Sequence, residues 1–275
     1  MSSRRHRWIL GLGFWALGVS LAFAQFRGGE LNMPMRRMPA VVPDRNFVVC
    51  RLMYRQVRSE PSGGGWRTDY PYGEINLTRR LSELTKTPVS WDRSNTPNYY
   101  TVSALDDELF QCPFLIASDV GTVGFTDEEA QTLRTYFLKG GFLWADDFWG
   151  DPAWDQWSSE IGKVLPPAEF PIEDIPADDP ILRAQFTVPR VAQITNIRFW
   201  RQWDGRETSE RGEETRDVHF RGIRDVHGRL MVVMTHNTDV GDSWEREGED
   251  PAFFYQFSPN GYALGIDVLL YALTH

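Results

Sequence analysis

The sequence predicts a three-layer α/β sandwich in which helices cover both faces of a mostly parallel central sheet. A strand, a helix and a second strand follow one another over residues 113–145, and an apolar helix closes the chain over residues 261–273. Two strands joined by a helix form a right-handed parallel crossover, which places the helix on one face of the sheet. Residues 113–118 (PFLIAS) are apolar throughout, as expected for a parallel strand that is buried on both faces.

The first 45 residues precede this fold. Three arginines in the first seven residues are followed by an uncharged apolar stretch and a small-residue cleavage pattern at residues 22–24. This pattern predicts a secretory signal peptide over residues 1–24, because an uncleaved anchor would need a slightly longer apolar stretch. Residues 25–45 contain glycine and proline without a sustained period, so we expect a flexible linker followed by a single domain over residues 46–275. The mature protein is expected to be periplasmic or secreted and free of the membrane.

Each element is predicted from its apolar pattern and its bounding residues. Strands are expected where β-branched, aromatic and aliphatic residues run together: 46–54, 89–92, 113–118, 142–145, and a hairpin of 218–224 and 229–236. Helices are expected where apolar residues recur at helical spacing: 74–85, 126–138, 154–164 and 261–273, with one helical turn at 106–110. Thr126 and Glu129 form a capping box at the start of one helix, and Gly140-Gly141 ends it. Residues 166–189 and 201–216 are expected to be irregular.

Composition limits the partners. The chain has 29 Lys and Arg against 38 Asp and Glu, so its formal net charge is -9. Nucleic acids and anionic membranes are bound by clustered basic residues, so neither is expected, and a cell-envelope protein or a small ligand is expected instead. Cys50 and Cys112 are the two cysteines. An oxidising compartment permits a disulfide between them, whereas a cysteine inside a strand usually packs as a small buried apolar side chain, and both interpretations stay open.

The run CPFLIASDVGTVGFTDEEAQTLRTYFLKGGFLWADDFWG, residues 112–150, resembles the centre of the bacterial domain of unknown function 4159 family. FVVCRLMYRQ, the W-x-x-D-Y-P stretch at 66–71 and MTHNTDVGDSW also fit, so the resemblance covers roughly residues 46–275. It implies the flavodoxin-like fold of class I glutamine amidotransferases and no established activity. Relatives often carry Gly-His where this chain has Ser118-Asp119, so no role of that histidine is carried over.

Polar residues are expected at the carboxyl ends of the parallel strands, where open α/β sheets bind their ligands. The candidate ligand-binding crevice consists of Ser118, Asp119, Asp146, Asp147, His236, Asn237 and Asp239, with the loop residues Trp66, Asp69 and Tyr70. Converging carboxylates repel one another, so the crevice needs a cation, a base or a proton. For each aspartate taken singly, the competing interpretation is that it caps a helix or stabilises its own turn.

The leading functional interpretation is a non-catalytic ligand- or partner-binding domain with no cofactor. The sequence lacks G-x-S-x-G, and neither cysteine follows a strand in a glycine-flanked turn. Ser118-Asp119-Val120 is not expected to form a nucleophile elbow, so amidotransferase chemistry is expected to be absent. The alternative is a metal-assisted hydrolase in which Asp146, Asp147 and His236 hold a divalent ion and Asp119 is the base. A third interpretation is a scaffold subunit without a small-molecule site.

Overall fold

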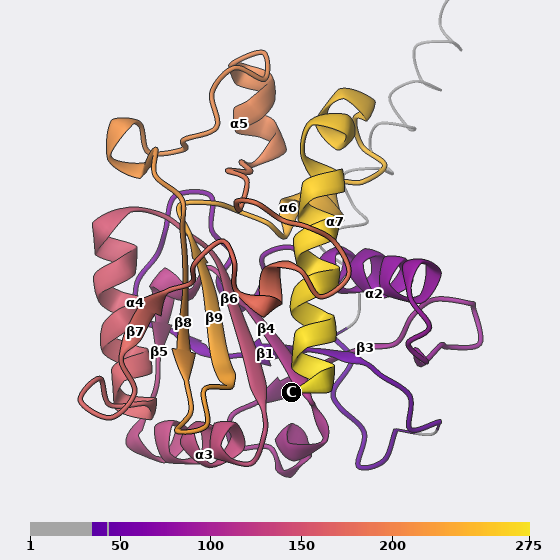
Figure 1. Cartoon of the computed structure of the whole chain (residues 1–275), viewed down its shortest axis with the longest axis vertical. Coiled ribbons are helices and arrows are strands. Elements are labelled where there is room, and N and C mark those ends of the chain that lie inside the picture. The colour runs from indigo at the N-terminus through magenta and orange to yellow at the C-terminus, as the bar shows by residue number, and fades with distance from the viewer. Residues whose placement is uncertain (1–34, 43) are drawn as a thin grey trace, which may run out of the picture. The chain divides into compact units, whose positions relative to one another are not determined.

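Parallel and antiparallel strands form one central sheet (Figure 1). The computed structural model describes residues 35–42 and 44–275, and residues 36–275 make up the unit that contains the sheet. In spatial order its strands are β3 (Tyr99–Ser103), β1 (Val49–Met53), β4 (Phe114–Ser118), β6 (Phe142–Phe148), β9 (Leu230–His236), β8 (His219–Arg224) and β7 (Ile172–Asp174). The first five run parallel, whereas β8 and β7 pair antiparallel to their neighbours. The mostly parallel α/β sheet predicted from the sequence is confirmed.

The parallel strands occur in the chain order second, first, third, fourth and fifth, which is the order of flavodoxin-like sheets. The order reverses between β1 and β4. In open α/β sheets, ligands bind beyond the carboxyl ends of the strands on the two sides of such a reversal. The topology therefore favours a site at the carboxyl ends of β1 and β4, beside those of β6 and β9.

Helices and short strands connect the sheet. The α-helices are α2 (Tyr72–Leu84), α3 (Asp127–Leu138), α4 (Gly150–Val164), α5 (Ile197–Gln202), α6 (Asp242–Glu245) and α7 (Pro251–Thr274). The 3-10 helices are η2 (Gly65–Arg67), η3 (Asp107–Gln111), η4 (Val120–Thr122), η5 (Pro180–Leu182) and η6 (Glu213–Thr215). A separate two-stranded sheet pairs β2 (Arg55–Gln56) with β5 (Val123–Gly124). The expected capping box is present, with Thr126 accepting from the Glu129 amide and Glu129 from the Thr126 amide.

Two hydrophobic cores lie on opposite faces of the sheet. Successive residues of a strand point to opposite faces, and in β6 Leu143 and Ala145 belong to one core while Phe142 and Trp144 belong to the other. The first core contains the buried sides of α3 and α4, and the second contains those of α2 and α7. Figure 1 shows the same arrangement, with α4 and α7 on opposite sides of the strands. The three layers of the predicted sandwich are present.

Cys50 and Cys112 form a disulfide, with 6.0 Å between their Cα atoms. The interpretation of Cys50 as an unpaired buried residue is therefore wrong, although both side chains are buried. Cys50 lies in β1 and Cys112 directly precedes β4, its neighbour in the sheet. Neighbouring parallel strands bring the two cysteines into bonding distance, a relationship that the sequence spacing alone does not contain.

One predicted strand is misplaced. Residues 89–92 form only isolated bridges, and the second parallel strand is β3 instead. The chain turns after Trp91, because the Asp92 carboxylate accepts hydrogen bonds from the amides of Ser94 and Thr96. The aromatic and β-branched residues of β3 (YYTVS) then pair with β1 along its whole length.

Three other elements are longer than the sequence predicts. Strand β6 continues through the two aspartates to Phe148, and α4 begins at Gly150. Helix α7 begins at Pro251, because the Asp250 carboxylate caps its first amides and proline fits the first turn.

Part of the predicted linker packs against the domain. Arg37 pairs with Thr101 at the outer edge of β3, and Met38 and Val42 are buried in the first core. Covering an edge strand in this way removes its unpaired backbone groups from solvent. The predicted signal peptide and the linker up to residue 34 lie outside the described residues. In the described part of the chain, we find no helix of sufficient length and apolar character to cross a bilayer.

Candidate functional site

Three neighbouring strands, β4, β6 and β9, carry polar residues at their carboxyl ends. Ser118, at the end of β4, pairs in register with Asp146 of β6. The β6–β9 pairing is irregular between Ala145 and Phe148, and Asp147 there has a positive φ of 54°. Such a bulge redirects side chains. The two adjacent aspartates therefore have different surroundings.

Asp146 is held by its neighbours. One of its carboxylate oxygens accepts a hydrogen bond from the Thr235 hydroxyl at 2.5 Å, and the other accepts from the Gly241 amide at 2.8 Å. Burial raises the pKa of Asp146 to about 6, although these hydrogen bonds lower it. Asp146 thus connects β6 to β9 and to the loop that follows β9.

Asp147 lies in a group of three carboxylates. One oxygen each from Asp69, Asp147 and Asp239 lie within 4.8 Å of one another, although these residues come from the loop before α2, from β6 and from the loop after β9. Asp69 and Asp239 are buried, and Asp147 is partly exposed. Carboxylate oxygens at this spacing are the ligands that hard divalent cations prefer. We call these three residues the cation triad.

The cation triad is electrostatically unfavourable without a positive charge. Burial and the neighbouring Asp242 carboxylate raise the pKa of Asp69 to about 8, although the positive charge of Arg51 lowers it. The pKa of Asp147 is well above its usual value because of burial and then because of four nearby carboxylates, with Asp69 the strongest. The pKa of Asp239 is also raised well above its usual value by burial and by Asp147. At neutral pH the triad therefore holds protons or binds a cation.

Asp69 is fixed by a chain of buried polar side chains. The Ser118 hydroxyl donates to an Asp69 oxygen at 3.3 Å, and Arg51 donates to the Ser118 hydroxyl at 2.6 Å. Arg51 in turn pairs with Glu74 at 2.5 Å, and both of these side chains are buried. Asp69 has a φ of 65°, a conformation that aspartate tolerates better than most residues. The hydrogen bonds hold the carboxylate of Asp69 in one orientation.

An open cleft adjoins the cation triad. Its lining includes Asp147 and Asp239 of the triad, the Asp119 side chain and Trp149. The remaining lining residues are Glu60, Pro61, Ser62, Gly63, Thr68, Asn196, Glu210 and Arg211. A ligand in this cleft would therefore contact two of the three triad carboxylates.

Asp119 stands on a sharp turn between β4 and η4. Its φ is 53°, and the 3-10 helix begins at the next residue. The turn expected after this strand is present, and the left-handed backbone of Asp119 with the short 3-10 helix behind it is the part that the sequence did not predict. The Gly65 amide donates to the Asp119 carboxylate at 2.7 Å, and a Cβ atom on Gly63 would lie only 2.3 Å from that carboxylate. The glycine loop thus encloses Asp119, and burial raises its pKa to about 7.

His236 belongs to an aromatic stack. Its ring lies 4.8 Å from the Phe148 ring and 5.4 Å from the Trp154 ring, and Nε2 is 3.2 Å from the Gly150 carbonyl oxygen. Burial lowers the pKa of His236 to about 4, so the ring is neutral at neutral pH. Among the described residues, the groups with suitable spacing for a metal ion contain neither His236 nor Asp146. Of the predicted ligands Asp146, Asp147 and His236, only Asp147 belongs to such a group.

The remaining predicted residues have structural contacts. Asn237 accepts from the Gly150 amide and so connects the end of β9 to the start of α4. Trp66 and Tyr70 form an edge-to-face pair at 5.8 Å, and the Tyr70 hydroxyl accepts from the Arg36 amide. In the described part of the chain, neither aromatic residue is among those that line the cleft.

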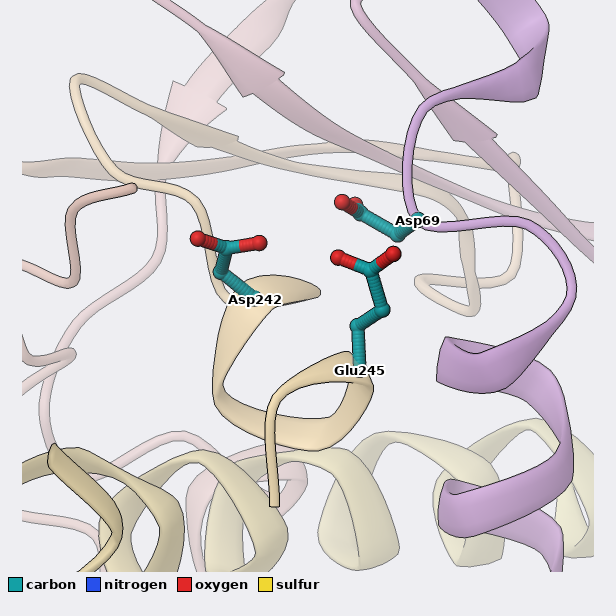
Figure 2. Close-up of side chains that lie close together, drawn as sticks. All are labelled: Asp69, Asp242 and Glu245. Atoms are coloured by element: carbon teal, nitrogen blue, oxygen red, sulfur yellow. The ribbon is translucent and has the colours of Figure 1, made fainter. Parts of the chain in front are cut away.

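A second acidic group shares Asp69 with the triad. Oxygens of Asp69, Asp242 and Glu245 also lie within 4.8 Å of one another. Figure 2 shows the Asp69 carboxylate, from the loop before α2, facing those of Asp242 and Glu245 on α6. Asp242 and Glu245 were not predicted from the sequence, although both lie at or just after the MTHNTDVGDSW run. Their spacing of three residues places them on one side of a helical turn.

A family model described as domain of unknown function (DUF4159) matches residues 50–273. The match includes the loop that carries Asp69, all the parallel strands beyond the first residue of β1, and α6. No curated protein matches the chain.

Proposed function

The chain belongs to the domain of unknown function 4159 family, and we propose that it is an exported binding domain whose cation triad holds a divalent metal ion. The observation that carries the proposal is that Asp69, Asp147 and Asp239 bring oxygens within 4.8 Å of one another beside an open cleft. A hard cation would compensate the three charges and accept oxygen ligands. The ligand of the domain would then complete the coordination of the ion from the cleft.

The position of the triad supports binding from the cleft side. Asp147 and Asp239 line the cleft, whereas Asp69 approaches from the protein side and is held by Ser118. Three protein oxygens leave coordination positions free, because calcium takes six to eight oxygen ligands and magnesium takes six. An oxygen-rich or anionic group is the ligand chemistry that such an ion would bind. The arrangement therefore favours a sugar, a carboxylate or a phosphate over an apolar ligand.

Export to the periplasm or beyond is part of the proposal. The signal-like sequence of residues 1–24 supports it, and so does the Cys50–Cys112 disulfide, since disulfides persist mainly in oxidising compartments. Calcium-binding modules outside the cytoplasm work with dissociation constants of about 0.1–1 mM. Weak binding by three carboxylates would suffice there.

We also propose that the scaffold is related to class I glutamine amidotransferases. The strand order supports this, as does the sharp turn after β4, which is where nucleophile-elbow enzymes carry their nucleophile. Here the turn carries Asp119, and both cysteines of the sequence are joined to each other. On this proposal, the turn carries a carboxylate at the place where a related enzyme would carry its thiol.

The experiment is a thermal unfolding series on the purified protein after treatment with a chelator. Adding Ca²⁺, Mg²⁺ or Mn²⁺ is expected to raise the melting temperature of the wild type, because a ligand of the folded state alone stabilises it. The Asp239→Asn variant should lose this response, whereas Asp151→Asn, an exposed aspartate on α4, should keep it. An equal response of Asp239→Asn and the wild type to all three ions would refute the proposal.

Asp119 favours a metal-assisted hydrolase as a second candidate function. Its pKa of about 7 suits a general base at neutral pH, and it lines the same cleft as Asp147 and Asp239. This candidate predicts cation-dependent hydrolysis of p-nitrophenyl acetate or bis(p-nitrophenyl) phosphate, with a rate that rises through about pH 7. Asp119→Asn should lose that rate and still bind the ion. Cation binding without any turnover of these probes would leave the binding domain as the better description.

A further inference from the structure

Arg246 lies against the second acidic group. It follows α6, and its Nε atom is 2.9 Å from a Glu245 oxygen and 3.6 Å from an Asp242 oxygen. The Arg246 side chain is 15% exposed, while those of Glu245 and Asp242 are 10% and 1% exposed. A guanidinium is permanently charged and binds carboxylates in a fixed planar geometry. A positive charge of the protein itself is therefore already present at this group.

The same carboxylates have the spacing of a metal site. Asp69, Asp242 and Glu245 face one another in Figure 2, and their nearest oxygens lie within 4.8 Å of one another. Asp69 belongs both to this group and to the cation triad. By spacing alone, the protein would hold two neighbouring ions with Asp69 as the shared ligand, as two-metal enzymes do.

We infer that Arg246 serves as the internal cation of the Asp69–Asp242–Glu245 group and restricts the protein to one bound metal ion, at the cation triad. This inference rests on the proposed function and goes beyond it, because it names the residue that sets the number of ions. Arg246 is not among the residues that line the cleft, whereas Asp147 and Asp239 are.

The contacts of the two groups support a different role for each. The Arg246 Nε atom lies within 3.6 Å of carboxylate oxygens on both Glu245 and Asp242, so one guanidinium of the protein compensates part of their charge. In the cation triad, by contrast, Asp147 and Asp239 line the open cleft, where an ion can reach them from solvent.

The restriction has a chemical consequence. A single ion polarises one ligand oxygen, whereas a pair of ions about 3.5–4 Å apart stabilises both the attacking and the leaving oxygen of a displacement. Arg246 therefore favours ligand binding or single-metal chemistry at this site over two-metal phosphoester chemistry.

The test measures how many Mn²⁺ ions bind per chain and compares Arg246→Met with the wild type. We expect one ion in the wild type and two in Arg246→Met, where removal of the guanidinium frees the second group. The two ions would share Asp69, so their electron paramagnetic resonance spectrum should show magnetic coupling. Arg246→Lys, which keeps the charge, should bind one ion.

Two results would overturn the inference and leave the proposed function intact: two ions in the wild type, or one ion in a folded Arg246→Met. If Arg246→Met does not fold, Glu245→Gln decides the question with Arg246 in place. We expect Glu245→Gln to bind one ion with an affinity within about threefold of the wild type, because Glu245 is not a ligand. A tenfold or larger loss would contradict the inference. A wild type that binds no ion would refute the proposed function itself.

Discussion

A carboxylate oxygen of Asp147 lies within 4.8 Å of one on Asp239, although Asp147 belongs to β6 and Asp239 follows β9. The two strands are neighbours in the sheet and run parallel, so their carboxyl ends meet at one edge. Asp69 reaches the same point from the loop before α2. Such a meeting of like charges is costly in a folded protein unless something compensates it. A divalent cation bound by the three carboxylates would supply that compensation.

Stability without a cation is expected to fall as the pH rises from about 6.5 to 8.5. The folded-state pKa values of Asp119 and Asp69 are raised to about 7 and 8, so the folded protein holds protons that the unfolded chain has lost. The stability associated with these protons is lost as the pH passes through the folded pKa values. Thermal unfolding in the presence of a chelator measures this loss. His236, with its lowered pKa, affects stability mainly at lower pH.

A saturating cation should remove the part of this pH dependence that comes from Asp69, because Asp69 would be a ligand of the ion. At 100 times its dissociation constant, a ligand of the folded state adds about 2.7 kcal/mol. In a protein of this size that corresponds to a rise in melting temperature of roughly 5–10 °C at about pH 8. A melting temperature that is constant or rises with pH in the chelator would contradict the raised pKa values.

Ser118 is expected to increase the affinity of the site for the cation without being a ligand of the ion itself. The Ser118→Ala change removes the hydrogen bond to Asp69 and leaves Arg51 without its hydroxyl partner. Residues that orient metal ligands typically contribute a factor of about 10–100 in affinity, so we expect Ca²⁺ or Mn²⁺ to bind at least tenfold more weakly. Titration calorimetry measures this. Ser82→Ala, which removes a partly buried hydroxyl on α2, is the control, and equal affinities of the two variants would argue against a positioning role.

The disulfide is expected to contribute about 4 kcal/mol to stability, from the chain entropy of a loop that joins residues 62 positions apart. The Cys50→Ala, Cys112→Ala double variant should therefore unfold at a lower denaturant concentration than the wild type. Both cysteines are buried, so a reductant should lower the midpoint of the wild type only after slow equilibration. The double variant supplies the control, because reductant should not affect it. Equal midpoints of the wild type and the double variant would contradict this prediction.

The sequence predicts where the site lies better than which atoms form it. Asp119, Asp146, Asp147 and Asp239 were placed at one edge because they follow strands, and strands are recognised from apolar patterns. The direction of each side chain depends on features outside those patterns. A bulge in β6 separates Asp146 from Asp147, and the ring of His236 joins an aromatic stack.

Contacts between residues that lie far apart in the sequence were also not predicted. Arg51 is a charged residue in the middle of an apolar strand, and only the fold shows that Glu74 and Ser118 surround it. The contact of Arg246 with Asp242 and Glu245 depends on a short helix that was not predicted from the sequence. The position of Arg51 inside an apolar run is the sequence signal that would have indicated its buried partners. Buried charges in such positions need partners.

Isothermal titration of the chelator-treated protein with Ca²⁺ and Mn²⁺ tests most directly whether the cation triad binds a metal ion. We expect one ion per chain in the wild type, at least a tenfold loss of affinity in Asp147→Asn, and an unchanged affinity in Asp155→Asn, an exposed aspartate on α4. The Asp147→Asn variant should also be more stable than the wild type in the chelator, since it removes one of three repelling carboxylates. Equal cation affinities of Asp147→Asn and the wild type would contradict a metal site at the triad.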